Sequence, residues 1–277
     1  MNARARGDQL FATAAPGVRW LLVEHAGPWP RRAFEASPTL TRVSERAAAA
    51  GVRAVLIRRP GRALPADTRS YAYVDARPGN EGVWWSTYTD ERQLLDVPFE
   101  PFETASAEPV HLVCAHGRHD TCCAVEGRPV AAALAAAGPG STWECSHVGG
   151  DRFAANLVLL PHGFYYGSLD PGTALAVAEA YRAGRVVPEY LRGRSVYVPA
   201  VQAAQHYART ATGDDRLDAF GVLGVEKLDE QTTRVRLDGA TVTVRAGWSA
   251  QAVLTCIADR PDRARIFEQV EISTRAR

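Results

Sequence analysis

The chain has 277 residues, a formal net charge of +1 and a hydrophobic fraction of 46%, so it is long enough for one large domain or for two of ordinary size. Because the charge is nearly balanced, we expect neither nucleic acid nor a membrane as a partner, and no apolar run reaches the about 20 residues that a membrane span needs. The charged N-terminus lacks the apolar segment of a signal peptide, which predicts a cytoplasmic protein whose cysteines stay reduced.

Hydrophobic periodicity and turn residues predict a first set of elements before residue 98. They are, in order, a strand at 19–24, a helix at 37–50, a strand at 52–57, a hairpin of 70–75 and 82–88, and a short helix at 90–95. Ser37 and Pro38 are typical of a helix start, and Gly51 of a helix end.

A proline-rich linker at 97–109 precedes a second set of elements in nearly the same order. They are a strand at 110–114, a helix at 126–137, a strand at 141–147, a hairpin of 156–160 and 164–169, and a helix at 173–183. This order is that of the thioredoxin fold. We therefore predict an α/β (α+β) protein of two thioredoxin-like halves, with mixed sheets flanked by helices.

The C-terminal part contains a predicted helix at 199–210 and a hairpin of 232–237 and 240–245, joined by the turn pair Asp238-Gly239. We interpret it as an accessory α/β module of βαβ type, and Cys256 in its apolar surroundings as an ordinary buried cysteine. The predicted domains are 1–98, which has no cysteine, 99–212 and 213–277.

Two short segments hold four of the five cysteines and three of the seven histidines: residues 114–123, CAHGRHDTCC, and residues 144–152, ECSHVGGDR. Thiolates and imidazoles suit iron and other thiophilic metals. The spacing of Cys114 and Cys123 is wider than that of a zinc knuckle. His147 and Asp151 flank two glycines that would let backbone N–H groups approach a cluster.

These two segments, VCAHGRHDTCCA and SHVGGDRFAAN, resemble those of the sucrase/ferredoxin-like family, and the resemblance covers roughly residues 20–210. It implies a thioredoxin-fold protein with a [2Fe–2S] cluster in domain 99–212, ligated by Cys114, Cys123, His147 and the residue at 151. Some family members have histidine where this chain has Asp151. The fourth ligand is therefore open between Asp151, Cys145, Cys122 and an unfilled position.

The remaining site residues are expected to support the cluster. Gly149, Gly150 and Arg152 are predicted to contact it, and His116 and His119 to be solvated loop residues, as His162 is in its turn. No catalytic residue is predicted. The leading hypothesis is one-electron transfer to or from an unidentified redox partner protein. The alternatives are a thiol-dependent oxidoreductase that uses Cys122 or Cys123, and a zinc-stabilised binding module.

Overall fold

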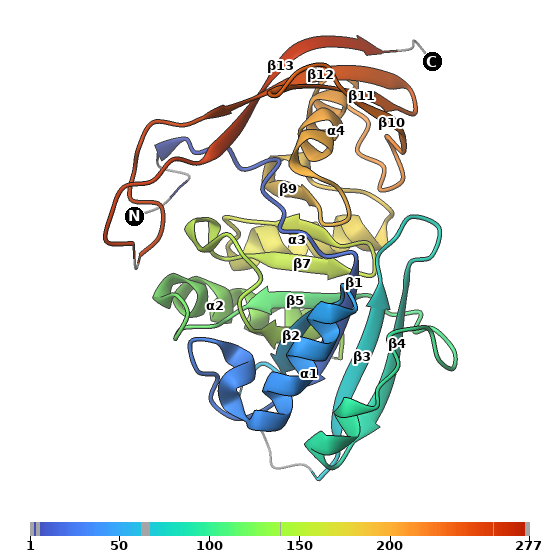
Figure 1. Cartoon of the computed structure of the whole chain (residues 1–277), viewed down its shortest axis with the longest axis vertical. Coiled ribbons are helices and arrows are strands. Elements are labelled where there is room, and N and C mark those ends of the chain that lie inside the picture. Colours follow the sequence, from blue (N-terminus) through green and yellow to red (C-terminus); the bar gives the residue numbers. More distant parts are fainter. Residues whose placement is uncertain (1–2, 4–5, 62–66, 139, 257, 275–277) are drawn as a thin grey trace.

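The computed structural model describes residues 3, 6–61, 67–138, 140–256 and 258–274. These residues form a nine-stranded mixed sheet and a four-stranded antiparallel sheet, with four α-helices packed on them (Figure 1). The predicted fold class is confirmed. Among the described residues, no helix combines the length and apolarity of a bilayer crossing.

The nine-stranded sheet contains both predicted halves. The first half consists of β1 (Arg19–Glu24), η2 (Ala33–Ala36), α1 (Pro38–Ala49), β2 (Arg53–Arg58), β3 (Arg69–Asp75), β4 (Gly82–Tyr88) and η3 (Glu91–Leu95). The second half consists of β5 (Val110–Cys114), α2 (Thr121–Ala137), β6 (Thr142–Cys145), η4 (Asp151–Phe153), β7 (Leu157–Leu160), β8 (Phe164–Tyr166) and α3 (Pro171–Arg182). The edge strand β9 (Leu191–Arg194) follows the short helix η5 (Pro188–Tyr190).

The two halves repeat one topology and meet through equivalent strands. The strand order is β4-β3-β1-β2-β6-β5-β7-β8-β9. Strand β1 is parallel to β2 and antiparallel to β3, and β5 is likewise parallel to β6 and antiparallel to β7. The junction of β2 and β6 is antiparallel and pairs only Ile57 with Cys145 and Arg58 with Glu144. A 2.8 Å ion pair between Arg58 and Glu144 stabilises it.

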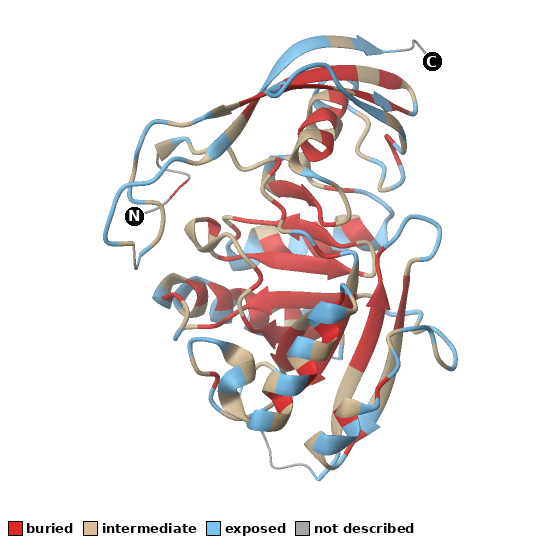
Figure 2. Cartoon of the chain, in the orientation of Figure 1, coloured by how far each residue is buried: buried red, intermediate tan, exposed pale blue. Residues whose placement is uncertain are grey.

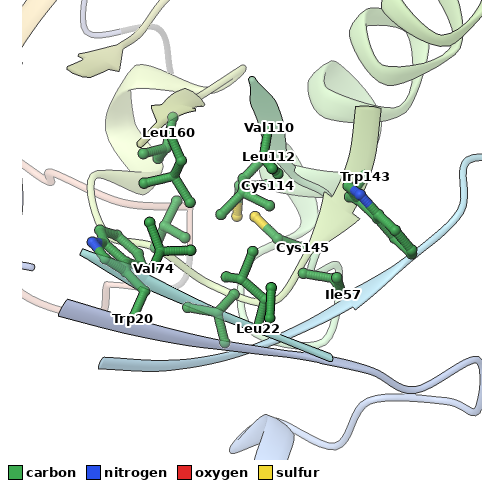
Figure 3. Close-up of a cluster of buried hydrophobic side chains, with 14 of the residues drawn as sticks. Trp20, Leu22, Ile57, Val74, Val110, Leu112, Cys114, Trp143, Cys145 and Leu160 are labelled. Carbon is green, nitrogen blue, oxygen red and sulfur yellow. The ribbon is translucent and has the colours of Figure 1, made fainter. Parts of the chain in front are cut away.

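Side chains on one face of the sheet pack against one another, and helices cover the other face. The first face holds one apolar cluster with residues of both halves, which include Trp20, Leu22, Ile57, Leu112, Cys114 and Cys145 (Figure 3). Helix α1 packs on the opposite face of the first half, and helices α2 and α3 pack on that of the second. The carboxyl ends of the parallel strands β5 and β6 therefore lie beside the start of α2.

The C-terminal part differs from the predicted βαβ-type module. Strands β10 (Val222–Lys227), β11 (Thr232–Leu237), β12 (Ala240–Trp248) and β13 (Arg265–Thr274) are all antiparallel to their neighbours. Helix α4 (Pro199–Thr212) packs against this sheet, and Phe11 and Ala12 near the N-terminus join the same apolar cluster. Much of β13 is exposed, whereas the strands of the large sheet are mostly buried (Figure 2). The domain boundaries after 98 and 212 remain a prediction.

Two element boundaries near the cysteines differ from expectation. Helix α2 begins at Thr121 rather than Glu126, because the Asp120 side chain caps it by accepting a 2.8 Å hydrogen bond from the backbone N–H of Cys122. Both Cys122 and Cys123 are therefore helical. The strand predicted at 141–147 ends at Cys145, which leaves His147 in the following loop.

Candidate metal centre

Cys114 and Cys123 come together because helix α2 approaches strand β5 closely. Cys114 is the last residue of β5, and Cys123 lies in the first turn of α2. At Gly127 a Cβ atom would lie 2.1 Å from the Cys114 carbonyl oxygen, so only glycine permits this distance between helix and strand. Both cysteines are buried, at 1% and 0% exposure.

The two thiols interact directly. A hydrogen bond from Cys123 holds the pKa of Cys114 well below its usual value, and His147 lowers that pKa further, against the opposing effect of burial. The same contact raises the pKa of Cys123. One sulfur of the pair therefore carries negative charge readily, which suits a cation as the next partner.

The loop from His147 to Asp151 is anchored by side chains from distant elements. Arg53 donates a 2.8 Å hydrogen bond to the Val148 carbonyl, and Arg192 donates one of 2.9 Å to the Gly149 carbonyl. Gly149 and Gly150 have φ angles of 95° and 87°. A Cβ at Gly150 would also lie 2.2 Å from the Arg192 guanidinium. In this structure the glycines shape the loop around Arg192; their contact with a cluster remains a prediction.

Arg192 was not found from the sequence, because its strand reads LRGR and has no apolar pattern that would mark a buried position. Its side chain is 1% exposed and donates to Thr13, Gly149 and Asn156. Within the described part of the chain, all its hydrogen bonds go to neutral groups. Burial lowers the pKa of Arg192 to about 10, so the guanidinium stays positive at neutral pH. A fixed cation therefore lies directly behind the loop.

His116 links the first half of the chain to this loop. It is 2% exposed rather than solvated, so that expectation was wrong. Its Nε2 lies 2.8 Å from the Pro30 carbonyl, and its Nδ1 is 3.3 Å from the backbone N–H of His147. Because a carbonyl only accepts, Nε2 donates to it and Nδ1 accepts from His147. A neutral imidazole satisfies both contacts, and burial lowers the pKa of His116 accordingly.

His119 was also expected in solvent, but it lies against the site. Its ring stacks on that of His147 with 3.7 Å between centroids and an interplanar angle of 13°. The Asp151 carboxylate faces both rings, at 3.1 Å from His147 Nδ1 and 3.8 Å from His119 Nε2. Burial raises the pKa of Asp151, while the two histidines oppose that shift.

These residues form two overlapping groups of potential ligands. Cys114, Cys123 and His147 bring one ligand atom each within 4.8 Å of one another, and so do His119, His147 and Asp151. Among the described residues, buried His147 Nδ1 and Asp151 Oδ1 have no hydrogen-bond partner, although they lie 3.1 Å apart. The two thiols and the His147 imidazole fit a thiophilic metal or cluster. The unsatisfied pair beside them is unusual, because buried polar atoms normally have partners.

The alternative cysteines belong to neither of these two ligand groups. Cys145 pairs with Cys114 across the strands, shares its apolar cluster and points its sulfur toward that of Cys114 (Figure 3), but it does not join the three ligand atoms that lie within 4.8 Å of one another. Cys122 forms a disulfide with Cys256, which is exposed. The prediction of a buried, reduced Cys256 was therefore wrong, because the loop that carries it lies outside the apolar core.

Of the two remaining candidates, Arg152 and His162, only His162 differs from expectation. The Arg152 guanidinium lies 4.6 Å from the centre of the Phe153 ring and lines a cavity of about 330 Å³ beside the Cys122–Cys256 disulfide. Its contact with a cluster remains a prediction. His162 is half-buried rather than exposed, and its Nδ1 contacts the Tyr181 hydroxyl.

Comparison with known proteins gives one finding. No curated protein and no solved structure matches this chain significantly. Residues 10–193, however, match the sequence profile of a family described as Sucrase/ferredoxin-like. That match includes the nine-stranded sheet almost to its last strand and both cysteine segments. The chain therefore belongs to the sucrase/ferredoxin-like family.

Proposed function

We propose that this protein is a cytoplasmic one-electron carrier that holds a [2Fe–2S] cluster. Cys114 and Cys123 would bind one iron, and His147 with a fourth ligand would bind the other. The observation that carries the proposal is the convergence of two buried sulfurs and one imidazole nitrogen within 4.8 Å. A bound cluster would supply reversible uptake of one electron.

The environment of these residues supports electron transfer. The cysteines are buried, whereas the His147 side chain is 23% exposed, so the histidine side would face a redox partner protein. Replacing thiolate by neutral imidazole reduces the negative charge of the site. The reduction potential should therefore lie above that of plant-type ferredoxins.

The buried positive charge of Arg192 favours a negatively charged group at the candidate metal centre. The guanidinium is buried and its hydrogen bonds within the described chain go to neutral groups, so no carboxylate there pairs with it directly, and Asp151 acts on its charge only at longer range. A buried cation is costly unless a negative charge lies near it. A thiolate-bound cluster would provide that charge without a direct bond to Arg192.

The test is anaerobic purification followed by iron and sulfide analysis, absorption spectroscopy and EPR of the reduced protein. We expect two irons and two sulfides per chain. Cys114→Ser should lose the cluster, whereas Cys145→Ser, at the partner position on the neighbouring strand, should keep it. A colourless protein, or equal loss in both variants, would contradict the proposal.

A zinc-stabilised module is the second candidate, because three ligand atoms within 4.8 Å also suit one tetrahedral ion. The same metal analysis separates the two. One zinc per chain without sulfide would favour the zinc module, and iron with equimolar sulfide would exclude it.

A further inference from the structure

We propose that His119 is the fourth cluster ligand and that Asp151 is a positioning residue for both histidines. The inference rests on the proposed function. It assigns the second iron two imidazoles from different segments: His119 from the loop before α2 and His147 from the loop after β6. Asp151 would not bind iron.

The stacking of the two rings gives the first argument. Parallel rings with centroids 3.7 Å apart can present nitrogen atoms side by side at a similar separation. Metal–nitrogen bonds are about 2.1 Å, so two ligands of a tetrahedral ion lie about 3.4 Å apart. The separation of the His119 and His147 rings is therefore nearly that of two ligands on one ion. Because an imidazole binds a metal in the plane of its ring, the two rings would have to turn out of the parallel stack to share that ion.

The position of Asp151 gives the second argument. Its Oδ1 faces His147 Nδ1 at 3.1 Å and its Oδ2 faces His119 Nε2 at 3.8 Å, so each oxygen faces one ring. Histidine ligands usually donate their outer N–H to a carboxylate, which fixes the ring orientation. A carboxylate that faces His147 Nδ1 and His119 Nε2 leaves the other ring nitrogens, His147 Nε2 and His119 Nδ1, for the metal. Carboxylate oxygen is also the harder donor, whereas imidazole suits iron.

The backbone fixes His119 relative to the cysteines. The N–H groups of His119 and Asp120 both donate to the His116 carbonyl at 3.1 Å. Asp120 then caps α2, whose first turn carries Cys123. His119 is thus held by the same turn that positions a cysteine ligand, and its side chain is only 29% exposed.

Pulsed EPR of the reduced protein, labelled with ¹⁵N-histidine, tests the inference by counting the nitrogens coupled to the cluster. We expect two in the wild type and in Asp151→Asn, and one in His119→Ala. Arg118→Ala is the control for disturbance of the loop and should show two. His119→Cys should keep the cluster with one coupled nitrogen, which covers the case in which His119→Ala does not retain iron.

The outcomes separate this inference from the proposed function. A wild-type cluster with a single coupled nitrogen would overturn the role of His119 and leave the electron carrier intact. Two coupled nitrogens that persist in His119→Ala would also overturn it. A wild-type protein without iron and sulfide would refute the proposed function, and the ligand assignment with it.

Discussion

Replacing Gly127 by alanine should separate the two cysteines without touching either of them. The new Cβ would lie 2.1 Å from the Cys114 carbonyl oxygen and 3.1 Å from its carbon. A carbon–oxygen contact needs about 3.3 Å. Since backbone atoms cannot rotate away, α2 and β5 would have to move apart by about 1.2 Å, the difference between 3.3 Å and 2.1 Å.

That movement is large on the scale of metal coordination. With metal–sulfur bonds of about 2.3 Å, two thiolates on one tetrahedral ion lie about 3.8 Å apart. Alanine gains about 1 kcal/mol of helix propensity over glycine, while overpacking costs about 1–3 kcal/mol or more. We expect a net loss of up to about 2 kcal/mol in the free energy of unfolding, and a decrease of about 10- to 100-fold in metal affinity.

The assay is iron and sulfide content per chain after anaerobic purification, together with urea unfolding of the same preparations. Gly172→Ala is the matched control, because Gly172 is also helical and its added Cβ would meet only Asp170 Oδ1 at 3.4 Å. The control should keep its iron and lose no stability. Full iron content in Gly127→Ala, with a free energy of unfolding within about 0.5 kcal/mol of the control, would show that Gly127 does not set the distance between the two cysteines.

Three further changes test the surroundings of the site. Burial lowers the pKa of His111 to about 4 from 6.5. The unfolded chain therefore binds a proton that the folded chain does not, and the free energy of unfolding should fall by up to about 3 kcal/mol as the pH falls from 6.5 to 4. Denaturation measured across that pH range should show a smaller fall in His111→Leu. Arg192→Lys should lose the bonds to the 147–151 loop, destabilise the fold by about 3 kcal/mol or more in urea, and lower the iron content. Cys256→Ser should lower the free energy of unfolding by about 2–4 kcal/mol, because the disulfide with Cys122 spans a sequence separation of 134; unchanged stability on adding dithiothreitol to the wild type would argue against that contribution.

The repeated order of elements could be predicted because each half carries its own periodicity and turns. The junction between the halves could not. Strands β2 and β6 pair through only two residues each, next to the ion pair between Arg58 and Glu144. Two such residues far apart in the sequence carry no periodic signal. The pairing of β2 with β6 therefore follows from the fold of both halves and not from a local pattern.

Residue type and spacing predicted one part of the candidate site. Cys114, Cys123 and His147 lie in segments whose composition alone suggests metal binding, and the structure places them together. His116 and His119 could not be placed, because loop histidines depend on partners elsewhere in the chain. The partner of His116 is Pro30, 86 positions away. One local signal was available: Asp before Thr-Cys-Cys is a typical N-cap.

The first half shows why fold alone does not make this site. Strand β1 ends at Glu24 beside Ile57 of its parallel partner, as β5 ends at Cys114 beside Cys145. Glu24 occupies the position that corresponds to Cys114, and its carboxylate accepts a 2.8 Å hydrogen bond from the backbone N–H of Ser70. The strand end of the first half is therefore already occupied by a protein contact. The second half differs at the same place in two respects: a thiol, that of Cys114, ends the strand, and the loop after β6 brings His147 close to it.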